Sequence, residues 1–399
     1  MRDPWLQSSI RKLWILLLCP AFLTAAPVAR SSPFCSDAGC RATHALFKNM
    51  CDFIVQKRSM YPTIYVGGYY MRDLVDGYEI FGDRQYLDTA IAYGDYLLKQ
   101  QMPNGFWPSG YGWVALADTG SALGLFSALY SHVDQRRQAE YRHAVLRYLN
   151  SVEKDGMVLK NGAVGDGWAH VKNGRLTDPD YEPYTLSSAL TGGNVFTWAY
   201  YLTKQNKYRD VAYHALKWIL STMRSDGNIP YISRTEGADW AKRGNGNPQN
   251  DYNLWQRMTY GTSAYVGEGV ISFDLHCGNA AWRAWIQKAV RPNIEFLLRT
   301  QLPDGTWSKL GRTSWDRTRS PGIVNYLTWY YEHVQKDPRT VKAVRRWDAF
   351  VLNPQNGKAY GLLNDGATGG TKANAFNSAT SLAGRALADI ISPGVDARW

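Results

Sequence analysis

The sequence predicts an all-α, single-domain toroid of six helical hairpins, the (α/α)6 architecture. First, residues 97–107 (LLKQQMPNGFW) and 297–307 (LLRTQLPDGTW) are nearly the same segment, and such internal similarity is typical of repeat architectures. Second, a charged type of helix alternates with an apolar type along the 399 residues. Third, no linker-like stretch divides the chain into two domains.

The charged helices are amphipathic, and a polar residue followed by glycine ends most of them. We expect them at 40–59, 84–101, 135–154, 206–224, 279–301 and 338–352. Degenerate copies of the repeat lie at 148–158, 218–229 and 349–360. Because one face of each helix is polar, these helices should form the outer layer of the toroid.

The apolar helices are rich in Gly, Ala, Ser and aromatic residues. We expect them at 69–81, 118–132, 186–204, 263–277, 322–335 and 377–391. Small residues allow helices to pack closely, so this set should form the buried inner ring. The last inner helix should then close against the first hairpin, as repeat units stack on their neighbours.

The connections between the helices differ in length at the two ends of the predicted ring. Turns from an inner to an outer helix are short, whereas the reverse connections are long, at about 103–117, 155–185, 225–262, 303–321 and 354–376. Long loops gathered on one face of a scaffold usually carry function. The candidate functional face therefore lies at the amino-terminal ends of the inner helices.

Residues 1–30 are typical of a secretory signal peptide, which leaves 31–399 as the toroid. Arg2, Arg11 and Lys12 precede an apolar stretch, LWILLLCPAFL, and small residues follow it. This stretch is short for a membrane span. We expect a secreted monomer, extracellular or periplasmic, with no membrane contact after cleavage.

Four cysteines remain in the mature chain: Cys35, Cys40, Cys51 and Cys277. In an oxidising compartment they could form two disulfides in any of three pairings, and CSDAGC could close a local loop. Their spacing does not match a metal site, so we predict neither a metal ion nor another cofactor.

The formal net charge of +11 favours an anionic partner. Nucleic acid is not expected, because no Lys/Arg cluster or recognition motif is present. An acidic polysaccharide or oligosaccharide fits secretion and the abundant aromatic residues better. The alternative is that the charge serves only solubility.

The long loops and the inner-helix starts contain the candidate site residues. Aromatic rings bind the flat faces of sugars, and arginines bind carboxylates. The candidate substrate-binding residues are Tyr69, Trp107, Trp113, Trp168, Tyr184, Tyr265, Trp315, Arg317 and Arg319. The candidate catalytic residues are Asp118, Asp73, Glu268, Tyr260 and His170.

Each of these residues also has a structural interpretation, and the aromatics could simply cap the helical ring. Asp118 could be an ordinary N-cap, and Asp73 could pair with Arg72 or Arg319. Glu268 lies between two glycines in an apolar helix, where a carboxylate is costly without a partner.

The alternating hairpins and their repeated ends resemble the six-hairpin toroid carbohydrate-active enzymes over the whole mature chain. The unsaturated glucuronyl and rhamnogalacturonyl hydrolases use an aspartate at an inner-helix start as acid and base, which implies Asp118 in ADTGSALGLFSAL. The helical-toroid polysaccharide lyases use tyrosine as base and acid beside groups that neutralise the uronate. That second resemblance implies Tyr260, His170 and Arg317.

The Q-x-x-x-G-x-W pattern also resembles the QW repeat of terpene cyclases. Those enzymes need a DxDD or DDxxD centre, and the sequence contains neither. The favoured hypothesis is a glycoside hydrolase that acts on an acidic, uronate-containing glycan by carboxylate acid/base catalysis. The alternatives are a lyase that cleaves a uronate glycan by β-elimination and a glycan-binding protein without catalysis.

Overall fold

The computed structural model describes residues 32–35, 37–57, 63–109, 113–167, 169–172, 175–177, 181–232, 259–307, 319–354, 356 and 378–395. The predicted signal peptide, at residues 1–30, lies outside the described residues. Three candidate site residues do so too: Trp168, Trp315 and Arg317.

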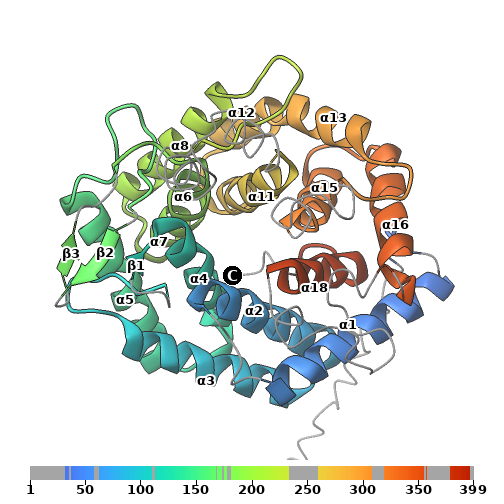
Figure 1. Ribbon diagram of the computed structural model, residues 1–399, viewed down its shortest axis with the longest axis horizontal. Coiled ribbons are helices and arrows are strands. Elements are labelled where there is room, and N and C mark those ends of the chain that lie inside the picture. Colours follow the sequence, from blue (N-terminus) through green and yellow to red (C-terminus); the bar gives the residue numbers. More distant parts are fainter. Residues whose placement is uncertain are drawn as a thin grey trace, which may run out of the picture. The chain divides into compact units, whose positions relative to one another are not determined.

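The described helices form two concentric layers, as the alternation predicts (Figure 1). The inner layer consists of α2 (Ile64–Phe81), α4 (Leu116–Leu129), the composite helix α6–η3–α7 (Thr185–Thr203), α11 (Thr259–His276), α15 (Gly322–His333) and α18 (Ser378–Ile391). Each inner helix packs against the next, and α18 packs against α2, which closes the ring. The (α/α)6 prediction is confirmed.

The outer layer surrounds this ring (Figure 1). It consists of α1 (Asp37–Lys57), α3 (Arg84–Gln100), α5 (Gln135–Lys154), α8 (Asn206–Ser221), α12 (Ala280–Ala289) with α13 (Arg291–Thr300), and α16 (Pro338–Leu352). Polar N-cap residues end the short turns that precede four of these helices. Asp83, Asp134, Asn279 and Asp337 each accept a backbone N–H from the first turn of the helix that follows, as N-caps do.

The middle of the third inner helix is the π-helical segment η3 (Ser188–Val195), which the sequence pattern did not predict. Gly193 of this segment lies against Gly269 of α11, where an added Cβ would be 3.0 Å from the Gly269 Cα. Single π-helical turns occur frequently at functional sites. Here the segment carries Asn194, whose side chain is buried.

The repeated Q-x-x-x-G-x-W segment joins neighbouring outer helices. The Gln101 side-chain amide donates to the carbonyl oxygens of Gly105 and of Ala144 on α5, both at 2.8 Å. Gln301 donates in the same way to Gly305 and to Ala343 on α16. The repeat is therefore a structural connection in which each glutamine links the end of one outer helix to the next.

The tryptophans of the repeat belong to the same connection. The indole N–H groups of Trp107 and Trp307 donate to Leu97 and Leu297 at 2.7 and 2.9 Å. Each tryptophan is about 1% exposed. The prediction that Trp107 binds substrate is wrong, because its ring lies in the core and its one polar group is already bonded.

The copy of the repeat predicted at 148–158 is in the wrong register. Gly156 lies at the end of α5, and an added Cβ there would meet nothing within 4 Å. The turn equivalent to the repeat comes six residues later, at Gly162, whose added Cβ would be 3.0 Å from the carbonyl oxygen of His214 on α8. Its N–H bonds to Leu159, as that of Gly105 bonds to Met102.

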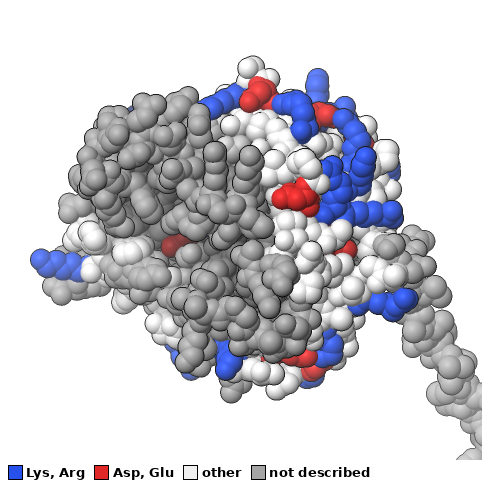
Figure 2. All heavy atoms as spheres, turned by 45° about the vertical axis from the view of Figure 1, so that its right-hand side comes forward, with Lys and Arg blue, Asp and Glu red and all other residues white. Residues whose placement is uncertain are grey.

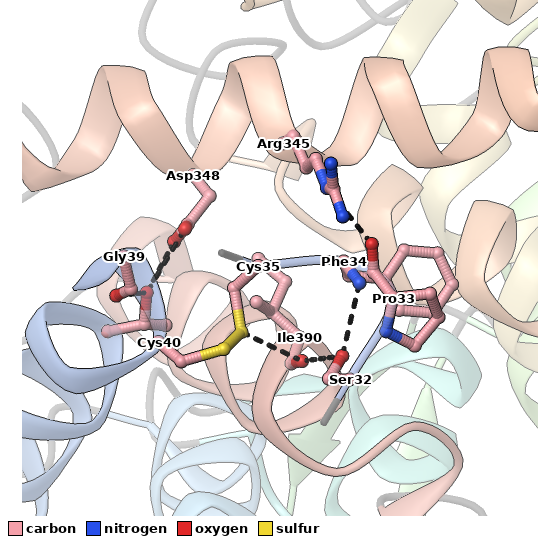
Figure 3. Close-up of a disulfide and its surroundings, with 10 residues drawn as sticks. Ser32, Pro33, Phe34, Cys35, Gly39, Cys40, Arg345, Asp348 and Ile390 are labelled. Carbon is pink, nitrogen blue, oxygen red and sulfur yellow. Dashed lines mark hydrogen bonds between the residues drawn. A yellow bond between two sulfur atoms is a disulfide. The ribbon is translucent and has the colours of Figure 1, made fainter. Parts of the chain in front are cut away.

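An N-terminal strap, residues 32–35, lies across the closure of the ring (Figure 3). The Ser32 hydroxyl donates to the carbonyl oxygen of Ile390 in α18 at 2.5 Å. Arg345 of α16 donates to the carbonyl oxygen of Pro33 at 2.9 Å. The strap therefore connects the segment before α1 to α16 and α18, the helices of the last hairpin.

Cys35 and Cys40 form a disulfide between this strap and the first turn of α1 (Figure 3). This is the local loop that the CSDAGC segment permits. Cys51 and Cys277 are buried and unpaired, so the described residues contain no second disulfide.

A small antiparallel sheet was not predicted by the sequence pattern. It consists of β1 (Trp113–Val114), β2 (Ala169–Lys172) and β3 (Arg175–Thr177), in that order. Both long connections that supply its strands lead toward inner helices. No helix in the described part of the chain has the length and apolar character that a membrane crossing requires.

Candidate functional site

A carboxylate lies in the centre of the inner ring, surrounded by four side chains that donate hydrogen bonds to it. Glu268 of α11 accepts from Arg72 at 2.5 Å and from Arg385 at 2.9 Å. The Tyr69 hydroxyl donates at 3.0 Å and the Asn194 amide at 3.2 Å. These donors come from α2, α18 and η3, so Glu268 connects helices that are far apart in the sequence.

The ion pairs keep Glu268 charged. Burial by itself would raise its pKa, but Arg385 and Arg72 lower it to about 2. A carboxylate with so low a pKa is a poor proton donor at neutral pH and a weak base. This geometry fits the fixed centre of an ion-pair network better than the catalytic acid proposed for Glu268 from the sequence.

A second group of polar residues lies at the amino-terminal ends of the inner helices. Asp118 is in the first turn of α4, Arg319 precedes α15, and Tyr265 is in the first half of α11. Arg319 hydrogen-bonds to Tyr265 and acts electrostatically on Asp118. We call Asp118, Tyr265 and Arg319 the mouth triad.

Asp118 has the pKa of a group that can both give and take a proton near neutral pH. Burial raises its pKa to about 7, and the positive charge of Arg319 limits the rise. The N-cap interpretation of Asp118 is wrong, because the N-cap position of α4 is Ala115. A carboxyl with a raised pKa beside a cation is a functional-site candidate.

Two tyrosines link the mouth triad to the Glu268 network. The rings of Tyr69 and Tyr265 lie 6.4 Å apart, centroid to centroid. Burial raises the pKa of both phenols, and the charge of Glu268 raises them further. Both tyrosines therefore stay protonated at neutral pH: Tyr69 donates to Glu268, and the Tyr265 oxygen accepts from Arg319.

Two other predicted site residues, Tyr184 and Asp73, are buried. Tyr184 is 4% exposed and its hydroxyl is 2.9 Å from that of Tyr231, so its polar group is already hydrogen-bonded within the protein. Asp73 is fully buried on α2, and an added Cβ at Gly384 of α18 would be 2.4 Å from its carboxylate. This placement gives Asp73 a role in packing α2 against α18.

The remaining predicted residues in the described part of the chain keep some exposure. Trp113 is partly buried and pairs with exposed His170 across β1 and β2. Tyr260 is partly buried at the start of α11 and stacks on Phe296 of α13, with ring centroids 6.0 Å apart. The structure thus places Trp113 and His170 on the small sheet and Tyr260 against an outer helix.

Sequence reasoning missed Arg385 and Asn194 as members of the central network. Arg385 stands in SLAGRALADII, an otherwise apolar helix, and a buried arginine needs a partner for the same reason that Glu268 does. That signal could have identified Arg385. Asn194 offered no comparable signal, because its position depends on the π-helical segment. Among the described residues, no three His, Cys, Asp or Glu side chains form a group that could hold a metal ion.

No protein-family model matches the sequence, and no curated protein matches it. Solved structures match in fold. An unsaturated glucuronyl hydrolase from Bacillus sp. GL1 has a TM-score of 0.58 at 14% identity, over 90% of this chain and 98% of that chain. A polysaccharide lyase has a TM-score of 0.56 at 14% identity, over 89% and 97% of the two chains.

The type II terpene cyclase MstE from Scytonema also matches, with a TM-score of 0.55 at 14% identity over 88% of this chain and 98% of that chain. The expected likeness to six-hairpin toroid carbohydrate-active enzymes is thus confirmed at the level of fold. Because one fold supports many chemistries, and the terpene cyclase is among the matches, function has to be argued from the site.

Proposed function

We propose that this protein is a glycoside hydrolase that acts on an acidic, uronate-containing glycan, with Asp118 as its general acid and base. The observation that carries the proposal is the position of Asp118 at the start of α4 with a pKa of about 7. General acids work best when their pKa is close to the working pH. The similarity in fold to an unsaturated glucuronyl hydrolase supports the same class.

The proposal favours a hydrolase that uses one carboxylate. Most glycosidases need two carboxyl groups on opposite sides of the scissile bond. Glu268 is a poor second group, because Arg72 and Arg385 already bind both of its oxygens. The hydrolases of unsaturated uronates, which the sequence resembles, need only one aspartate, and Asp118 would meet that need.

Arg319 supports an anionic substrate. It lies beside Asp118 and Tyr265, and it precedes a helix whose amino-terminal end favours negative charge. A uronate carboxylate could pair with this guanidinium while Asp118 protonates the reacting carbon or oxygen.

A lyase is the second candidate, and Tyr260, which stacks on Phe296, stays its candidate base; the two tyrosines of the ring centre, Tyr69 and Tyr265, are poorly suited to that role. Elimination needs a base that removes the proton next to the uronate carboxylate. The pKa values of Tyr69 and Tyr265 are both raised, so neither phenol ionises readily. A glycan-binding protein without catalysis is the third candidate, and the turnover assay below separates it from the hydrolase.

The test follows the ultraviolet absorbance of the conjugated uronate double bond. The purified mature protein is incubated with uronate polysaccharides and, separately, with their lyase-generated unsaturated oligosaccharides. We expect the absorbance to fall with the oligosaccharides, because the enzyme consumes the double bond. A rise with the polysaccharides would show elimination and would refute the hydrolase assignment.

Asp118→Asn should lower the rate at least about 100-fold, since positioned acid/base groups contribute that much or more. Asp348→Asn is the matched control. Burial raises the pKa of Asp348 to about 7 as well, but its carboxylate binds the Thr43 hydroxyl between α16 and α1. Equal rates in Asp118→Asn and Asp348→Asn would contradict the proposed role of Asp118.

A further inference from the structure

A band of aromatic and cationic side chains lies on the outer helices α8 and α12, apart from the mouth triad. Tyr213 of α8 stacks on Trp282 of α12, with ring centroids 4.4 Å apart and planes 14° apart. Trp285 meets the same tyrosine edge-on at 4.9 Å. All three rings are partly exposed, so part of each ring is accessible to solvent beside α8.

Two cations, Arg209 and Lys217, lie over these rings, and a third, Lys204, lies over Tyr201. Arg209, Tyr213 and Lys217 follow one another at four-residue spacing, so they share one face of α8 over about 12 Å. The Arg209 guanidinium lies 4.9 Å from the Trp282 ring and 5.0 Å from the Tyr200 ring. Lys217 lies over Tyr213 at 5.7 Å, and Lys204 lies over Tyr201 at 4.7 Å.

These cations have no ion-pair partner among the residues that the structure describes. Some other exposed cations do, as in the pairs of Lys207 of α8 with Glu153 and of Arg339 with Glu295. Lys and Arg side chains also gather on the face that Figure 2 brings forward, with Asp and Glu among them. α8 carries a single acidic residue, Asp210, and α12 carries none. The band is therefore positively charged and aromatic at the same time.

We propose that this band, formed by Arg209, Tyr213, Lys217, Trp282 and Trp285, is a surface binding site for an acidic polysaccharide. Sugar rings would lie against the partly exposed aromatic rings, and uronate carboxylates would pair with the cations on either side. The site goes beyond the proposed function, and only the choice of a uronate polymer rests on that function. The band would hold one part of the polysaccharide while another part of the same polysaccharide reaches the mouth triad.

The test measures retardation in native gels that contain polygalacturonate at fixed ionic strength. All proteins carry Asp118→Asn, which limits turnover. We expect Arg209→Gln with Lys217→Gln to weaken binding about tenfold, which equals about 1.4 kcal/mol. The matched control is Lys99→Gln with Lys342→Gln, which removes two cations from the outer helices α3 and α16 and should leave binding unchanged.

An equal loss of polygalacturonate binding in the two double variants would overturn the proposal, because it would show that binding depends only on net charge. Undiminished binding by the Arg209/Lys217 variant would overturn it as well, as would equal retardation in fully methyl-esterified polygalacturonate. With Asp118 intact, the Arg209/Lys217 variant should turn over short unsaturated oligosaccharides at the normal rate. Failure of the proposed function would appear in that turnover assay and failure of the surface site in the gels.

Discussion

Replacing Glu268 by glutamine should be among the most destabilising single changes in the inner ring. The substitution keeps the size of the side chain and removes its charge. The folded pKa of about 2, against an ordinary 4.5, corresponds to about 3 kcal/mol at neutral pH, since one pKa unit is about 1.4 kcal/mol. The neutral amide would also break the buried ion pairs with Arg72 and Arg385, and breaking a buried pair typically costs about 3 to 5 kcal/mol. We therefore expect Glu268→Gln to lower the free energy of unfolding at pH 7 by about 3 to 5 kcal/mol.

Urea unfolding at pH 7 and at pH 3 measures this effect. Because the folded pKa is depressed, the contribution of Glu268 is complete above about pH 4.5 and decreases as the pH falls toward 2. The difference in the free energy of unfolding between the native protein and Glu268→Gln should therefore be smaller at pH 3 than at pH 7. Glu295→Gln, in an exposed pair with Arg339, is the control and should cost at most about 1 kcal/mol. A loss below about 1 kcal/mol for Glu268→Gln at pH 7 would refute the reasoning.

Three further predictions concern the site, the repeat and the strap. Arg319→Gln removes the charge that lowers the pKa of Asp118, so the alkaline limit of the pH–rate profile should move to higher pH; an unchanged limit would contradict the assigned pair. Gly305→Ala should lose about 1 to 3 kcal/mol more in urea unfolding than Gly156→Ala, because both have positive φ but only the first places a Cβ 2.3 Å from a backbone oxygen; equal losses would disprove the close contact. Reducing the disulfide at the start of α1 should lower stability by about 2 kcal/mol, as expected for so short a loop, and unfolding with and without reductant measures it.

The sequence by itself determined the architecture of the ring. The alternation of apolar and amphipathic segments is a local property, because a helix shows in its own residues whether one side or all sides will be buried. The N-caps Asp83, Asp134 and Asp337 are equally local, since each bonds within three residues of itself. The same holds for the Gly305 turn, whose positive φ a side chain would disfavour.

Only the tertiary structure decided which polar residues meet. Arg72 and Arg385 lie 196 and 117 residues from Glu268 in the sequence, so nothing local pairs them. The orientation of the Trp107 ring was also decided by the tertiary structure, because residues of neighbouring helices, such as Phe126 and Tyr148, cover it. Side-chain contacts across a ring depend on how all hairpins close together, and the pKa values of Asp118 and Glu268 follow from those contacts.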